Sequence, residues 1–218
     1  MVIISKKPIE SYFWQGVVPP YRELKKLVSS KETESKKRGS KKKVRIVELG
    51  CGTRKYPGSI GVDVKKRRFV DIVWDLEKTP YPFADNSIDM IVCREVIEHL
   101  HNTKGFMSEA SRILNDKGIL YLTTNNRKSL INRLFKTYEK SSHCSLQDIQ
   151  SLKNLVSREL EIVKFFCLPY SDQDRTDLKY KTFRPFRILL HKTLPQSLQE
   201  RMVVIATNRT RTKRSQIE

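Results

Sequence analysis

Acidic residues are scarce in this chain. Its 218 residues include 43 Lys and Arg but only 24 Asp and Glu, which gives a formal net charge of +19. A charge this large exceeds what solubility requires and favours a polyanionic partner, with nucleic acid as the first candidate. A solvated, lysine-rich surface without a specific partner is the alternative. The basic residues concentrate in three segments, 36–43, 65–68 and 209–214.

Long apolar runs are also missing. No stretch approaches the roughly 18 consecutive apolar residues of a membrane span. The first residues lack the charged start and extended apolar segment of a secretion signal. We therefore expect a cytoplasmic protein without a membrane partner, and an apolar content of 38% is enough for one sizeable core.

Closely spaced cysteines are absent. The four cysteines, Cys51, Cys93, Cys144 and Cys167, are far apart and form no C-x-x-C pair. This spacing excludes a zinc knuckle and a disulfide framework. We expect free thiols in the core or in turns.

The chain lacks a complete dinucleotide-binding fingerprint. The segment Glu48-Leu49-Gly50-Cys51-Gly52 follows an apolar run over 44–47, and this pattern predicts a buried strand that ends in a glycine turn. A G-x-G-x-x-G fingerprint needs a third glycine where this chain has Lys55. Asp63 follows Gly52 by about 11 positions, too few for the usual crossover helix. A nicotinamide or flavin cofactor is therefore disfavoured.

Two further predicted strands end in acidic residues. Residues 59–62 lead to Asp63, and residues 70–74 lead to Asp75. Because ligands of open α/β sheets bind at the carboxyl ends of the strands, three strand ends are expected to converge on one ligand. Together with the later segments 86–89 and 95–100, these residues resemble the class I S-adenosylmethionine-dependent methyltransferases, most closely the type 11-like branch. The resemblance is good over residues 44–126.

The resemblance implies an α/β fold of the Rossmann-like methyltransferase type, with a mostly parallel seven-stranded sheet and helices on both faces. It implies that Glu48 holds the glycine turn and the cofactor's amino group, and that Asp63 accepts from both ribose hydroxyls. Asp75 would meet the adenine amino group and Leu76 the ring. The cofactor-binding residues expected on this basis are Glu48, Gly50, Cys51, Gly52, Asp63, Val64, Asp75, Leu76 and Arg94.

The chain divides into three regions. We expect an N-terminal helical segment and basic linker over 1–43, a methyltransferase domain over 44–208 and a basic tail over 209–218. A loop is expected to replace the helix after the first strand at 53–59, which would let Arg54, Lys55 and Tyr56 reach a substrate. The family places a substrate lid at 169–201, although an apolar stripe such as 183–190 is more often core packing. Other expected helices are 9–28, 96–100, 106–114 (stopped by 115–118), 130–135 and 146–156, and other expected strands are 87–92, 119–123, 160–166 and 202–206.

A group of carboxylates and imidazoles follows the predicted fourth strand. Glu95, Glu98 and His99 have the spacing that shares one helical face, and with His143 they could bind Mg²⁺, Mn²⁺ or Zn²⁺. The pattern resembles the E-x-x-E-H motif and distant His of small-RNA 3′-end 2′-O-methyltransferases and of ubiquinone-pathway O-methyltransferases. In the type 11-like branch, the Glu-His pair is instead structural or faces the substrate. His99 and Glu95 are also the candidate catalytic bases, with His143 as a third.

The acceptor is not specified by any motif. The N-methyltransferase signature after the fourth strand is absent, and Cys93-Arg94-Glu95 stands in its place, which argues against methylation of DNA bases or amides. We expect a methyltransferase with an unidentified acceptor, and the charge favours RNA. The alternatives are a nucleic-acid-binding module that keeps the fold without turnover and a small-molecule O-methyltransferase.

Overall fold

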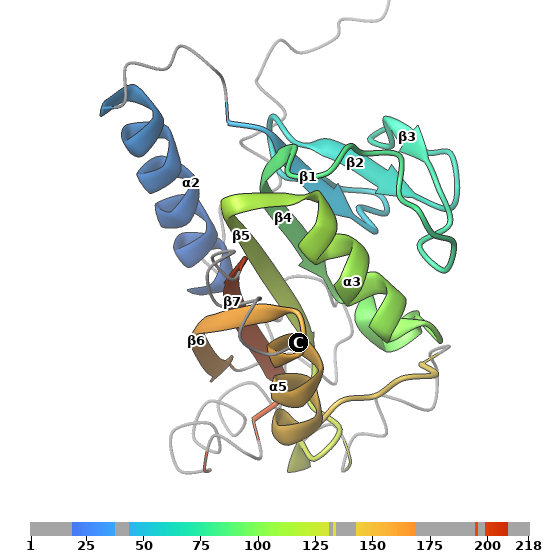
Figure 1. Cartoon of the computed structure of the whole chain (residues 1–218). Coiled ribbons are helices and arrows are strands. Elements are labelled where there is room, and N and C mark those ends of the chain that lie inside the picture. Colours follow the sequence, from blue (N-terminus) through green and yellow to red (C-terminus); the bar gives the residue numbers. More distant parts are fainter. Residues whose placement is uncertain are drawn as a thin grey trace, which may run out of the picture.

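A seven-stranded sheet forms the centre of the molecule (Figure 1). The computed structural model describes residues 19–37, 44–130, 133, 143–168, 195 and 199–208. The strand order is β3-β2-β1-β4-β5-β7-β6, and β7 alone runs antiparallel to its neighbours. The strands are β1 (Ile46–Leu49), β2 (Ile60–Asp63), β3 (Ile72–Val73), β4 (Ile88–Arg94), β5 (Leu114–Asn125), β6 (Leu160–Leu168) and β7 (Arg201–Asn208). The expected Rossmann-like methyltransferase fold is confirmed.

Helices cover both faces of the sheet. Within the described ranges, the helices with defined bounds are α2 (Pro19–Lys37), the 3₁₀ turn η1 (Ile97–His99), α3 (Thr103–Ile113) and α5 (Ile149–Ser157). Figure 1 shows α2 on the opposite side of the sheet from α3 and α5. Alternation along β4 explains this arrangement, because successive strand side chains point to opposite faces. Ile91 and Cys93 pack in the core with α3 and α5, whereas Met90 and Val92 pack with α2.

The sequence of α3 accounts for its boundaries. Asn102 caps the helix by accepting a hydrogen bond from the Gly105 amide at 2.9 Å. The helix ends at Ile113 and passes directly into β5. Residues 115–118, expected to end the helix, instead form a bulge in β5 opposite β4. The Asn115 side chain donates to Asp89 Oδ1 at 2.6 Å and stabilises this bulge.

Two expected elements have different lengths in the structure. The strand expected over 70–74 is reduced to the two residues of β3, an edge strand that pairs only with β2. The helix expected over 9–28 is described from Pro19 and continues beyond residue 28 to Lys37, because the Lys and Glu residues of this segment favour helix. Part of the expected basic linker is therefore helical.

Several expectations fall outside the described residues. They concern residues 9–18, most of 130–135, the tail over 209–218, and the substrate lid over 169–201 except for 195 and 199–201. Across the ranges that are described, none of the helices has the length and apolar character needed to cross a membrane. All four cysteines are free thiols.

The connection between β1 and β2 contains no helix, as expected. It consists of turns over residues 50–59. The three residues expected to reach a substrate behave differently from one another. Tyr56 is buried in the core with α2, Lys55 forms an ion pair with Asp71, and Arg54 is exposed. The expectation for Tyr56 is therefore wrong, because its ring belongs to the hydrophobic core.

The packing of α2 can be tested with Leu24, whose side chain is 1% exposed. We expect Leu24→Ala to lower the free energy of unfolding by about 2–5 kcal/mol, since it removes buried methyl groups and leaves a cavity. Urea unfolding followed by circular dichroism measures this change. The adjacent exposed Lys25→Ala should change it by less than about 0.5 kcal/mol. Equal effects of the two substitutions would show that α2 does not pack on the sheet.

Candidate cofactor and acceptor site

The glycine turn after β1 lies against β2 and β4. The amides of Gly50 and Cys51 both donate to the Val62 carbonyl, at 2.8 and 3.0 Å. A Cβ atom on Gly50 would lie 2.3 Å from Val96 Cγ2, so this glycine lets the segment after β4 pack on the turn. At Gly52, which has φ +59°, the nearest atom to a Cβ would be Arg67 Nη1 at 4.0 Å. The turn is therefore open to a ligand at Gly52.

Glu48 and Arg94 form an ion pair at the ends of β1 and β4. Glu48 is 1% exposed and accepts from both Arg94 Nε, at 2.8 Å, and the Tyr56 amide. Burial raises the pKa of Glu48, and the Arg94 guanidinium opposes that rise. Arg94 also donates to the Arg54 carbonyl at 3.2 Å. Both predicted cofactor residues thus order the loop over 53–59.

Asp63 points at the glycine turn. Its Oδ2 accepts from the Gly52 amide at 2.8 Å, and its Oδ1 accepts from the Lys65 amide at 3.1 Å. A carboxylate has about four acceptor sites, so two remain for ligand hydroxyls. The neighbouring Val64 side chain is 58% exposed and offers an apolar surface beside Asp63. This environment fits a sugar with an attached ring.

Three other predicted cofactor residues are partly or wholly taken up by the protein itself. Asp75 is partly exposed, and its Oδ1 accepts from the Glu77 amide at 3.1 Å. The Leu76 side chain is buried in the core, so an adenine ring could contact only the small exposed part of that side chain. Burial, followed by the negative charges of Glu48 and Asp63, raises the pKa of the Cys51 thiol to about 11. Cys51 therefore stays protonated and is no nucleophile.

The predicted helical face of Glu95, Glu98 and His99 does not form. Glu95 has φ +54°, outside the helical region, and the following helix η1 contains only three residues. The Glu95 carboxylate instead accepts from Thr123 Oγ1 at 2.9 Å and pairs with Arg201 Nε at 3.1 Å. The spacing argument was wrong because the backbone at Glu95 turns the side chain towards β5 and β7.

Glu98, His99 and His143 nevertheless come together. Each offers one ligand atom, and these atoms lie within 4.8 Å of one another. The two imidazole ring centroids are 4.7 Å apart. The Cys144 and Ser145 amides donate to the Glu98 carbonyl at 2.9 and 3.0 Å, which holds the segment of His143 against η1. Glu95 is not a member of this cluster.

The cluster combines a buried acid with imidazoles. Glu98 accepts from Thr124 Oγ1 at 2.8 Å and from Asn125 Nδ2 at 3.0 Å. Burial raises the pKa of Glu98 most, the negative charge of Glu95 raises it further, and the resulting pKa is about 8. Burial lowers the pKa of His143, and the neighbouring His99 lowers it further. The neutral imidazole of His143 is the form that binds metals.

Sequence reasoning missed the supporting residues on β5 and β7. Thr123, Thr124 and Asn125 end the long apolar strand β5 at the edge where β1 and β4 also end. A polar run directly after an apolar strand was the signal that could have found them. Arg201 had no such signal, because its pairing with Glu95 depends on the antiparallel placement of β7.

The sequence profile of a family described as a methyltransferase domain matches residues 20–159, so this chain belongs to that family. Residues 20–159 therefore form a methyltransferase domain of the S-adenosylmethionine-dependent class. The open turn at Gly52, the acceptor atoms of Asp63 and the exposed Val64 fit that cofactor.

Two uncharacterized proteins of Methanocaldococcus jannaschii are similar in sequence. One is 32% identical over 83 residues, 36% of this chain and 36% of that protein. The other is 23% identical over 156 residues, 63% of this chain and 76% of that protein. The chain thus matches about a third of the length of the first relative.

Solved methyltransferases share the fold. A possible histamine N-methyltransferase from Thermotoga maritima has a TM-score of 0.54 and 20% identity, covering 77% of this chain and 84% of that one. The geranyl diphosphate C-methyltransferase of Streptomyces coelicolor, solved with Mg²⁺ and S-adenosylhomocysteine, has a TM-score of 0.53 and 15% identity, covering 76% and 73%. A methyltransferase from Archaeoglobus fulgidus has a TM-score of 0.51 and 16% identity, covering 76% and 86%.

The role of Asp63 can be tested by calorimetric titration of S-adenosylmethionine. We expect Asp63→Ala to weaken binding by about 1.5–3 kcal/mol, because the ribose hydroxyls and the Gly52 amide would lose a charged acceptor. Asp116→Ala removes an exposed carboxylate from the β5 bulge and should leave the affinity unchanged. Unchanged affinity in Asp63→Ala would place the ribose elsewhere.

Proposed function

We propose that this methyltransferase transfers the methyl group to RNA. The supporting observation is a basic loop, Lys65 to Arg68, which directly follows Asp63. All four of its side chains are exposed. Arg67 reaches the glycine turn, since its Nη1 lies 4.0 Å from the position of a Cβ on Gly52. Positive charge therefore borders the predicted cofactor site.

The shape of the basic loop is set by its own contacts. Lys66 Nζ donates to the Val70 carbonyl at 3.0 Å, and the Arg68 guanidinium lies 5.3 Å from the Phe69 ring centroid. These contacts hold two of the four basic side chains against the residues that follow the loop. Lysine and arginine contacts to phosphate supply most of the affinity of nucleic-acid binding and fix the register of the nucleic acid. The net charge of +19 supports the same class of partner.

The chemistry places limited demands on the protein. S-adenosylmethionine supplies a methyl group that is already activated, so the chain must hold the acceptor atom about 3–3.5 Å from it. A base is needed only if the acceptor loses a proton. His99 is exposed at the end of η1, after β4, and is the first candidate base where it holds no cation. Glu95 is the second, although its pairing with Arg201 favours a role in positioning.

We also propose that Glu98, His99 and His143 bind a divalent cation that orients an acceptor hydroxyl. Two imidazoles and one carboxylate form a ligand set typical of Zn²⁺ and Mn²⁺. Because burial raises the pKa of Glu98 to about 8, cation binding at neutral pH would release the Glu98 proton. Thr124 and Asn125 hold the Glu98 carboxylate in place, as residues around metal ligands commonly do. The proposal favours a hydroxyl acceptor over an amine.

Charge removal in the basic loop tests the RNA proposal. We expect the triple variant Lys65→Ala, Arg67→Ala, Arg68→Ala to bind single-stranded RNA more weakly and with a smaller salt dependence. If three phosphate contacts are lost, the slope of log affinity against log salt should fall by about 2. Fluorescence anisotropy over a salt series measures both quantities.

A charge-matched variant provides the control. Lys25→Ala, Lys26→Ala, Arg158→Ala removes three exposed charges from α2 and from the end of α5. It should retain most of the affinity and of the salt dependence. Equal losses of RNA affinity in both variants would show that the basic loop is only part of a generally charged surface. Failure of RNA to accept methyl groups would refute the proposed acceptor.

The cation proposal is tested by titrating Mn²⁺ into the protein. His99→Ala and His143→Ala should each abolish Mn²⁺ binding, because both imidazoles are needed to complete the ligand set. His101→Ala is the control, since His101 is exposed and lies outside the cluster. Methyl transfer should also stop in excess chelator. Full turnover in chelator, with no Mn²⁺ bound by the wild type, would leave the histidines a structural pair.

A further inference from the structure

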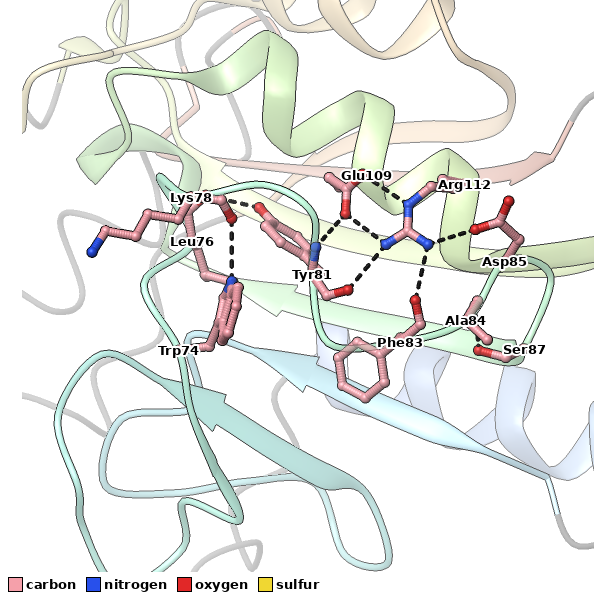
Figure 2. Close-up of polar contacts among 10 residues, drawn as sticks. All are labelled: Trp74, Leu76, Lys78, Tyr81, Phe83, Ala84, Asp85, Ser87, Glu109 and Arg112. Atoms are coloured by element: carbon pink, nitrogen blue, oxygen red, sulfur yellow. Dashed lines mark hydrogen bonds and ion pairs between the residues drawn. The ribbon is translucent and has the colours of Figure 1, made fainter.

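The connection between β3 and β4 is irregular but strongly held. Residues 74–87 contain neither helix nor strand. In Figure 2, side chains of α3 supply the hydrogen bonds that secondary structure would otherwise make. Asp75, the predicted adenine residue, is the second residue of this connection. Its anchoring therefore bears on the cofactor site.

Arg112 of α3 is the first anchor. Its Nη1 donates to the Phe83 carbonyl at 2.9 Å, and its Nη2 donates to the Tyr81 carbonyl at 3.1 Å. Glu109 pairs with the same guanidinium at 2.7 and 2.8 Å, and Asp85 pairs with it at 2.6 Å (Figure 2). The Arg112 hydrogen bond lowers the pKa of Glu109, so the ion pair persists at physiological pH. These bonds fix the backbone at Tyr81.

Tyr81 extends the anchor towards Asp75. Its amide donates to Glu109, and its buried ring packs edge-on against Phe106 at a centroid distance of 6.4 Å. The hydroxyl donates to the Leu76 carbonyl at 2.9 Å. Burial raises the pKa of Tyr81, so the phenol keeps its proton and remains a donor. Figure 2 shows the Tyr81 side chain pointing from Glu109 and Arg112 towards Leu76.

A second anchor acts on the other side of Leu76. The Glu77 carboxylate accepts from the amides of His101 and Asn102, at 2.7 and 2.9 Å, just before α3 begins. Leu76 is therefore held by Tyr81 at its carbonyl and by Glu77 at the next residue. Asp75 immediately precedes this fixed point. Its carboxylate has little freedom to move relative to the sheet edge.

We propose that Tyr81 is a positioning residue for recognition of the adenine. Its hydroxyl, held in place through the Arg112 and Glu109 clamp, sets the backbone at Leu76 and hence the Asp75 carboxylate that accepts from the adenine amino group. The proposal rests on the assignment of Asp75 to that group. It concerns cofactor selectivity and assigns Tyr81 no part in methyl transfer.

The experiment compares two ligands whose bases differ at the adenine amino group and at the adjacent ring nitrogen, which carries a proton only in the inosyl compound. S-adenosylhomocysteine carries this amino group, whereas S-inosylhomocysteine carries an oxygen in its place. We expect the wild type to prefer S-adenosylhomocysteine, and Tyr81→Phe to reduce that preference about fivefold, the loss expected for one hydrogen bond of roughly 1 kcal/mol. The affinity for S-inosylhomocysteine should stay nearly constant. Isothermal titration calorimetry measures both constants.

Ser87→Ala is the matched control. It removes a hydroxyl that donates to the Ala84 carbonyl at 2.6 Å in the same connection but far along the chain from Leu76. The control should keep the wild-type preference. If Tyr81→Phe weakens both ligands equally, or keeps the preference, the positioning role is refuted and Tyr81 serves stability alone. A wild type without any preference would instead refute the assignment of Asp75, while binding of either ligand would still support the methyltransferase.

Discussion

The ion pair between Glu48 and Arg94 is the interaction on which the site depends. A carboxylate that is 1% exposed is strongly destabilising unless it is paired and hydrogen-bonded. Glu48 meets this requirement through Arg94 and the Tyr56 amide. The same bonds join β1 to β4 and fix the loop after the glycine turn. This buried pair therefore reinforces the pairing of β1 with β4, the two strands next to the predicted cofactor and acceptor residues.

This ion pair also explains how the connection between β1 and β2 is ordered without a helix. In a crossover of ordinary length, a helix would cover the turn and order its backbone. Here three interactions order the loop over 50–59. Glu48 accepts from the Tyr56 amide, the Val62 carbonyl accepts from the amides of the glycine turn, and the Tyr56 ring is buried. The short connection leaves Gly52 open, and Arg67 of the basic loop after Asp63 lies near this glycine. An acceptor with phosphates would meet positive charge as it approached the cofactor.

The segment after β4 is organised by an unusual backbone conformation at Glu95. Glu95 has φ +54°, which is rare for a residue with a side chain and costs roughly 1–3 kcal/mol unless the surroundings impose it. Its amide donates to the Thr123 carbonyl at 2.9 Å, and its carboxylate meets Thr123 and Arg201. The turn at Glu95 directs Glu98 into the interior and leaves His99 at the surface beside His143. A regular helix would have placed Glu95 in the cluster instead.

The sequence by itself determined the parallel core and predicted the sheet edge at which a cofactor would bind. Apolar strands that end in Gly50, Asp63 and Asp75 specify both, because a buried strand must be apolar and the ends of parallel strands meet at one edge. Tertiary structure alone decided which acids remain available to a ligand. Glu48 is taken up by Arg94, and Glu95 by Arg201, a partner that lies 106 positions away along the chain. Neither pairing follows from local spacing, because such contacts depend on how distant strands pack and not on the period of one element.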